Sequence, residues 1–146
     1  MAPDARSLTL SLLRDRYTIL QFAANAVVPA WAMSGEFFSI TRNPDELSVV
    51  TQIANLPVWE TAETDWRVFK VHGPFAFNEI GVLASLTEPL AKREIGIFVI
   101  STFDTDYLLV QAAQVRKAVG ALREAGHSIV DSEFIFEDTK ENEGCV

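Results

Sequence analysis

The sequence predicts an α+β fold, and three observations lead to that prediction. The chain has 146 residues, of which 49% are hydrophobic and 22% are charged, which suits one compact domain or two small ones. From residue 66 onward the hydrophobic patterns predict strand, helix, strand, strand, helix and strand in that order. This order is the split βαβ pattern of a ferredoxin-like unit, and the strand-rich first half resembles a shortened copy of it.

The first two strands of the chain are expected to form a hairpin. Residues 7–13 and 17–22 are both strand-like, with apolar and β-branched side chains. The polar break at residues 14–16 is short enough for a tight connection between them. Residues 23–35 should follow as a loop or one short helical turn.

A second strand pair is expected in the segments FFSITRN and ELSVVTQ, which are rich in β-branched and aromatic residues. Asn43, Pro44 and Asp45 lie between them and favour a turn. Residues 51–65 lack a sustained hydrophobic period, which is typical of a connector. The shortened N-terminal unit and its connector are therefore placed at residues 1–65.

The C-terminal half begins with WRVFKVHG, whose period-2 alternation predicts a half-buried strand. FNEIGVLASLTEPLAKR then changes to helical spacing, with Asn78 as the expected N-cap. Ile80 and Leu83 are expected on the apolar face of this helix. Pro89 should kink the helix or make its last turn irregular, because proline removes one backbone donor.

A third hairpin is expected in IGIFVIST and YLLVQ, and a second helix in AAQVRKAVGALREAG. Gly126 should follow that helix as its C′ residue. SIVDSEFIFE alternates as a strand does and completes a βαββαβ unit at residues 66–137. An acidic tail at residues 138–146 remains.

The composition narrows the classes of function. Lys and Arg number 12 against 20 Asp and Glu, and the formal charge of −8 disfavours nucleic acid as a partner. The single Cys145 excludes an internal disulfide, and His72 and His127 are too far apart in sequence to suggest metal ligation. No stretch is apolar enough for a membrane span, and no secretion signal is recognisable. We expect a cytoplasmic protein without a metal or cofactor.

The common catalytic motifs are missing: the sequence contains no P-loop, no G-x-G-x-x-G after a strand, no H-E-x-x-H and no G-x-S-x-G. Ser48 and His72 could be imagined as nucleophile and base, but nothing in their spacing brings them together. We therefore expect a protein that is not an enzyme.

The segment from Phe75 to Leu83 joins a strand to a helix and could bind a carboxylate. Free backbone N–H groups and the helix dipole favour an anion at such a point. Gly81 would let a ligand approach the backbone closely. The alternative is that Gly81 only allows the helix to pack tightly on the sheet, and the sequence leaves both readings open.

The tip of the third hairpin, residues 102–106, could hold the other end of a zwitterion. Asp106 could pair with an ammonium group, while Thr102 and Phe103 would form the rim of the site. The alternative is a polar hairpin turn, in which Asp and Thr are common.

A weak internal repeat relates the two halves. FFSITRNPDELSVV matches IFVISTFDTDYLLV at an offset of 60 residues. The matched positions are Phe38 with Phe98, Ile40 with Ile100, Glu46 with Asp106 and Val50 with Val110.

The strings DELSVV at 45–50 and GVLASLTEPLAKREIGIFVISTFDTDYLLV at 81–110, with the strand that begins at Trp66, resemble small ACT-domain proteins related to the eukaryotic cytosolic arginine sensors. The resemblance covers roughly residues 8–137. It implies two ACT units that bind a free amino acid between them and act as a sensor or regulatory part without catalysis. Because the eukaryotic sensors have four units where this chain has two, it also implies a homodimer.

By position, the resemblance implies ligand contacts from the first unit, from the helix start and from the hairpin. The implied residues are Ser48, Val49, Gly81, Val82, Leu83, Thr102, Phe103 and Asp106. The identity of the ligand does not transfer, since the connector carries no recognisable effector-binding motif. Two other functions stay open: a dimerisation or adaptor module with a vestigial pocket, and a ferredoxin-like enzyme subunit with Asp45, Glu46 and Asp106 in its site.

Overall fold

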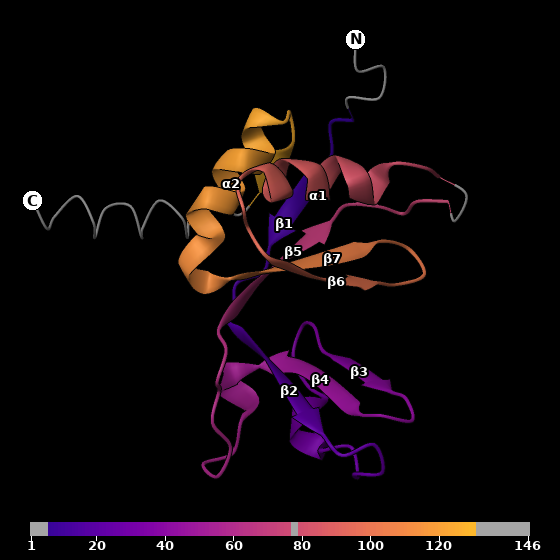
Figure 1. Cartoon of the computed structure of the whole chain (residues 1–146), viewed down its shortest axis with the longest axis vertical. Helices are drawn as coiled ribbons and strands as arrows, with labels where there is room; N and C mark the ends of the chain where they lie inside the picture. The colour runs from indigo at the N-terminus through magenta and orange to yellow at the C-terminus, as the bar shows by residue number, and fades with distance from the viewer. Residues whose placement is uncertain (1–5, 77–78, 131–146) are drawn as a thin grey trace, which may run out of the picture. The chain divides into compact units, whose positions relative to one another are not determined.

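A computed structural model describes residues 6–76 and 79–130 of the protein (Figure 1). The chain divides into two compact units. Unit 1 combines Met1–Arg14 with Val68–Val146, and unit 2 is Asp15–Arg67.

Unit 1 is a five-stranded sheet with two α-helices. Its strands lie in the order β6-β7-β5-β1-β8. The elements are β1 (Thr9–Leu12), β5 (Trp66–Val71, in unit 1 from Val68 onward), α1 (Val82–Lys92), β6 (Ile97–Ser101), β7 (Asp106–Gln111), the 3-10 turn η3 (Ala112–Gln114), α2 (Val115–Glu124) and β8 (Ser128–Val130). The α+β class and the ferredoxin-like unit are thus confirmed, with β1 inserted between β5 and β8.

The strand β1 does not form the expected hairpin with the next strand of the chain. It pairs antiparallel with β5, where Leu10 lies opposite Val71, and parallel with β8, where Leu10 lies opposite Ile129. Leu10 and Leu12 are only 0% and 3% exposed, inside the core of unit 1. Burial of these two leucines outweighs the short connection at residues 14–16 that favoured a local hairpin.

This pairing corrects the expected domain division. Residues 6–14, the described part of the N-terminal segment, belong with the C-terminal half and not with an N-terminal unit at 1–65. The remaining boundary lies between Arg67 and Val68, two residues after the expected one. The C-terminal ferredoxin-like unit therefore takes one of its strands from outside residues 66–137.

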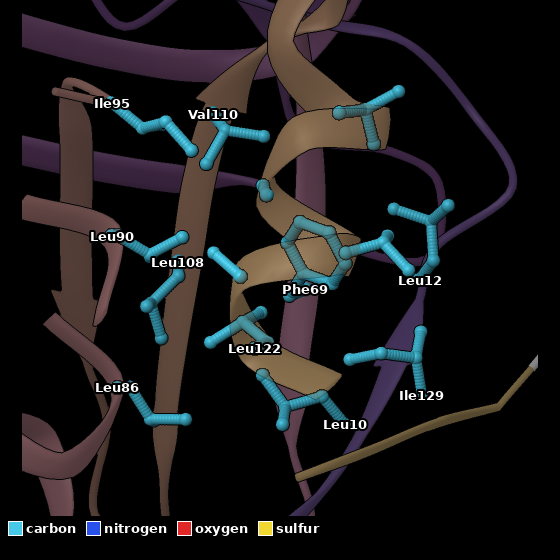
Figure 2. Close-up of a cluster of buried hydrophobic side chains, with 14 of the residues drawn as sticks. Leu10, Leu12, Phe69, Leu86, Leu90, Ile95, Leu108, Val110, Leu122 and Ile129 are labelled. Carbon is cyan, nitrogen blue, oxygen red and sulfur yellow. The ribbon is translucent and has the colours of Figure 1, made fainter. Parts of the chain in front are cut away.

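The core of unit 1 lies between the sheet and the two helices (Figure 2). Alternate residues of each strand enter it, as the period of 2 requires. The same cluster takes the apolar stripe of each helix. Its members include Leu10, Leu12, Phe69, Leu86, Leu90, Ile95, Leu108, Val110, Leu122 and Ile129.

The helix α1 begins later than the sequence suggested. Its N-cap is Gly81, and Ile80 precedes the helix and is 85% exposed instead of lying on the apolar face. The expected N-cap Asn78 lies outside the described residues. Pro89 lies inside the helix, where it cannot donate to the carbonyl of Ser85 four residues earlier.

The buried His127 takes the place of the hydrogen bond that Pro89 removes. Its Nε2 lies 2.9 Å from the Ser85 carbonyl oxygen, and its Nδ1 lies 3.1 Å from the Leu8 backbone nitrogen. The carbonyl can only accept and the amide can only donate, so Nε2 carries the proton. One neutral side chain thereby connects α1, the N-terminal segment and the start of β8.

The end of α2 agrees with the sequence. Gly126 has φ of +100°, in the left-handed region that glycine tolerates. The amide of Gly126 donates to the carbonyl of Arg123, and the amide of His127 donates to the carbonyl of Leu122. These two bonds form a Schellman motif, so the expected C′ glycine is confirmed. The expected last strand is described only as far as Val130, and its continuation and the acidic tail lie outside the described residues.

Unit 2 is an antiparallel sheet in the order β3-β4-β2. Its elements are β2 (Tyr17–Phe22), the 3-10 turn η1 (Ala30–Ala32), β3 (Ser39–Arg42), β4 (Leu47–Gln52) and the 3-10 turn η2 (Ile53–Asn55). The predicted turn between β3 and β4 is present, and Asn43 Oδ1 accepts hydrogen bonds from the amides of Asp45 and Glu46 at 2.8 and 3.0 Å.

Asp65 pairs with Arg16 in the same unit and raises the pKa of the Arg16 guanidinium group.

The internal repeat has a different offset in the structure. Arg42 lies opposite Leu47 at the end of the β3–β4 hairpin, and Ser101 lies opposite Asp106 at the end of the β6–β7 hairpin. From 42 to 101 and from 47 to 106 the offset is 59 residues, not 60. A one-residue shift moves every side chain to the other face of a sheet. Asp106 therefore corresponds to Leu47 and not to Glu46.

Candidate functional site

Two loops of unit 1 meet at the end of the sheet where α1 begins. One is the β5–α1 loop and the other is the tip of the β6–β7 hairpin; both lie at the same end of the unit in Figure 1. The amide of Phe75 donates to the carbonyl of Asp104 at 2.9 Å. Thr105 Oγ1 donates to the carbonyl of Val71 at 2.5 Å. These two bonds hold the hairpin tip against the loop that leads to the helix.

The contact between the two loops requires a glycine at position 73. A Cβ atom there would lie 2.8 Å from the Asp104 carbonyl oxygen and 3.2 Å from Thr105 Cβ. Real Cβ atoms essentially never approach another atom as closely as the first distance. Gly73 and Thr105 were not among the predicted site residues, and the only local signal for them is the Gly-Pro dipeptide at 73–74.

Within the described residues, no side chain caps the start of α1. Gly81 has φ of +85° and serves as N-cap, and the Ser85 amide makes the first helical bond to its carbonyl at 3.0 Å. Val82 is 6% exposed and Leu83 packs against the core, so both side chains serve the core of unit 1. A Cβ at Gly81 would meet only Arg6 Nε, at 3.9 Å, within the described residues. Tight helix packing therefore does not explain this glycine, whereas its positive φ does.

Arg6, which was not among the predicted site residues, lies beside the helix start. Its Nη2 donates to the Ile80 carbonyl at 2.5 Å, and its Nη1 lies 3.3 Å from Glu79 Oε2. The segment that carries Arg6 is fixed by Ser7, whose Oγ donates to the Gly126 carbonyl at 2.8 Å. A cationic side chain is thus held next to Gly81 by contacts far away in the sequence.

The hairpin tip combines an ordered turn with an exposed aromatic ring. Thr102 Oγ1 donates to the Thr105 carbonyl at 3.0 Å, and the Thr102 amide donates to the same oxygen at 2.8 Å. Phe103 is 77% exposed at the end of this turn. Asp106 accepts a hydrogen bond from Ser101 Oγ across the hairpin.

The register of the hairpin defines the face of the sheet on which Asp106 lies. Asp106 is opposite Ser101, and two and four residues further along β7 lie Leu108 and Val110 on the same face. Leu108 and Val110 belong to the core beneath the helices. Asp106 therefore lies on the helix-covered face, at the end of the sheet where α1 begins. A carboxylate and the uncapped start of a helix occur on one face and at one end of unit 1.

The remaining candidates lie in unit 2. Ser48 and Val49 are in β4, opposite Gln21 and Leu20 of β2. Val49 is fully buried in the core of unit 2, and Ser48 is half-buried. Gly81, Val82, Leu83, Thr102, Phe103 and Asp106 belong to unit 1.

Groups for other kinds of chemistry are sparse. Within residues 6–76 and 79–130, no three His, Cys, Asp or Glu side chains gather in a way that could hold a metal ion. His72 Nε2 hydrogen-bonds Ser11 Oγ at 2.6 Å, so its serine partner is not the Ser48 considered above. No helix of the described part of the chain is both long and apolar enough to cross a membrane.

Family models match both halves of the chain. An ACT domain model matches residues 61–124. A second model, for an N-terminal domain, matches residues 15–58, close to the limits of unit 2. The two matches divide the sequence much as the structure does.

Three known proteins indicate what the chain is similar to. The human "cytosolic arginine sensor for mTORC1 subunit 1" is 34% identical over 59 residues, which are 40% of this chain and only 18% of the sensor. The crystal structure of aspartate kinase from Clostridium acetobutylicum is 14% identical with a TM-score of 0.55, covering 77% of this chain and 33% of the kinase, and shows a shared fold alone. The crystal structure of protein Atu0741 from Agobacterium tumefaciens is 43% identical with a TM-score of 0.79, covering 86% of this chain and 93% of that one. The chain therefore belongs to the same family as the Agobacterium protein and is a small ACT-domain protein related to the cytosolic arginine sensors.

Proposed function

We propose that the protein binds a free amino acid and acts as a non-catalytic sensor or regulatory protein. The observation that carries this proposal is the position of Asp106 on the helix-covered face, at the end where the uncapped α1 begins. An amino acid presents a carboxylate and an ammonium group. Helix-start amides suit the first, and an aspartate suits the second.

The geometry of unit 1 supports a preorganised site. Thr105 and Gly73 hold the hairpin tip against the α1 loop, so the two charged ends of a ligand would meet groups fixed by one body. Ser101 orients the Asp106 carboxylate before any ligand arrives. Preorganised groups lose less conformational entropy on binding, which favours affinity.

The other elements of the proposal rest on relatives. Ser48 and Val49 belong to the proposal on the resemblance alone, and Val49 is fully buried in the core of unit 2. Arginine is the first ligand to test, because the mammalian relatives are named arginine sensors. A homodimer and a cytoplasmic location also belong to the proposal. The whole sensors' activity does not transfer by itself, since this chain matches 18% of their length.

The test is a thermal-shift and calorimetry screen against the protein amino acids. A ligand present at 100 times its Kd should stabilise the folded protein by about 2.7 kcal/mol. Asp106→Asn keeps an oxygen that can accept from Ser101 but removes the charge, and should weaken binding at least about tenfold, or roughly 1.4 kcal/mol. Asp104→Asn is the matched control, because the contact of Asp104 with Phe75 uses its backbone carbonyl.

The outcomes separate the proposal from its rivals. If no amino acid stabilises the protein, a dimerisation or adaptor module with a vestigial pocket is favoured. If Asp106→Asn leaves the affinity unchanged, the ammonium group does not bind at Asp106, although the ligand is still an amino acid. Equal loss in both aspartate variants would point to an effect of net charge and not of a specific pair.

A further inference from the structure

The side chain of Arg6 already holds a carboxylate beside the candidate site. Its Nη1 lies 3.3 Å from Glu79 Oε2, with the two side chains 31% and 36% exposed. Charge-assisted N–H···O bonds are commonly about 2.7–2.9 Å long, so this contact is loose. The internal pair involves one carboxylate oxygen, whereas a guanidinium group can bind two in a planar fork.

The guanidinium group itself is held firmly at its other side. Nη2 donates to the Ile80 carbonyl at 2.5 Å, and the neighbouring residues of the chain are tied down by bonds from Ser7 to Gly126 and from Leu8 to His127. The position of Arg6 therefore does not depend on its partner Glu79.

Few atoms of the described residues lie on the side of Arg6 that faces the helix start. An added Cβ at Gly81 would find Arg6 Nε at 3.9 Å and no other atom of the described residues within 4 Å. Among the described residues, the Nε edge of the guanidinium group is therefore the nearest neighbour of this position next to the α1 backbone.

We infer that Arg6 is a further ligand-binding residue, which receives the carboxylate of the ligand, and that Glu79 is the internal carboxylate with which the ligand competes. This inference rests on the proposed amino-acid binding and assigns the anionic half of the ligand to a residue that the family resemblance did not supply. It predicts that the ligand must carry a carboxylate.

The experiment measures the affinity of each amino acid from the screen together with its carboxamide. Arg6→Gln should weaken the acid at least about tenfold and leave the amide nearly unchanged, since the amide lacks the charge that Arg6 would pair with. Glu79→Gln should strengthen the acid two- to threefold, because it removes the competitor. Arg93→Gln is the matched control: Arg93 also pairs with an exposed glutamate, Glu124, but follows the far end of α1.

Each outcome has a defined meaning. Two results would overturn the inference while amino-acid binding stands. In the first, Arg6→Gln weakens the binding of the acid and of the amide equally. In the second, Arg6→Gln weakens the binding of the acid no more than Arg93→Gln does. If the amide does not bind detectably, the carboxylate is essential and the comparison of Arg6→Gln with Arg93→Gln decides. If no amino acid binds the wild-type protein, the proposed function and this inference both fail.

Discussion

The contact of Gly73 with the hairpin tip gives a sharp prediction for Gly73→Ala. The new Cβ would lie 2.8 Å from the Asp104 carbonyl oxygen, and that oxygen also accepts the amide of Phe75 at 2.9 Å. The hairpin tip must move away, which strains the Thr105 bond to the Val71 carbonyl as well. The substitution should therefore separate the two loops of the candidate site.

The magnitude follows from three effects. Overpacking costs about 1–3 kcal/mol. Loss of the Phe75 hydrogen bond costs about 1 kcal/mol. Alanine restricts the unfolded chain and returns about 0.4–1 kcal/mol. The net expectation is a loss of about 2 kcal/mol in the free energy of unfolding.

The assay is urea unfolding, with amide exchange at Phe75 as a local probe. Gly120→Ala is the control, because an added Cβ there meets nothing within 4 Å inside α2, and it should stabilise the protein by about 1 kcal/mol. The reasoning would be refuted if Gly73→Ala had wild-type stability and its Phe75 amide were as well protected as in the wild-type protein. The hairpin tip would then accommodate the added Cβ without cost. The two loops would then not form one preorganised body.

Three further predictions concern the fold and the assembly. His127→Leu should lower the free energy of unfolding by about 2–4 kcal/mol, because it leaves the Leu8 amide and the Ser85 carbonyl unpaired. Adding Pro89→Ala to this variant should recover about 1 kcal/mol in urea unfolding, since the new amide can donate to the Ser85 carbonyl. Gly81→Val should cost about 1–2 kcal/mol in the same assay, because φ is +85°. Light scattering should give the mass of a homodimer, and a monomer mass that does not change on dilution would contradict this.

The sequence predicted the elements of the C-terminal half well because their signals are local. Hydrophobic period separates strand from helix, and Gly126 marks the end of α2 by its positive φ. The partner of β1 was not predictable in this way. Its sequence is compatible with a hairpin, and only the burial of Leu10 and Leu12 against Phe69 and Ile129 selects the distant pairing.

The residues of the candidate site also differ in whether the local sequence could predict them. Gly81 and Asp106 could be suggested from the sequence, because a glycine at a helix start and an acid after a hairpin turn carry a local signal. Gly73, Thr105 and Arg6 could not, since each acts through a residue that is distant in the sequence. Even Asp106 acquired its place on the helix-covered face only from the pairing register.

The register also bears on how many ligands one chain can hold. At the offset of 60 suggested by the sequence, Glu46 would have been a second acid equivalent to Asp106. At the offset of 59 that the hairpins have, the equivalent residue is Leu47, which is fully buried in unit 2. The β3–β4 hairpin therefore has no carboxylate at the position of Asp106. An ammonium group bound by Asp106 would have no second partner of the same kind at the equivalent position of unit 2.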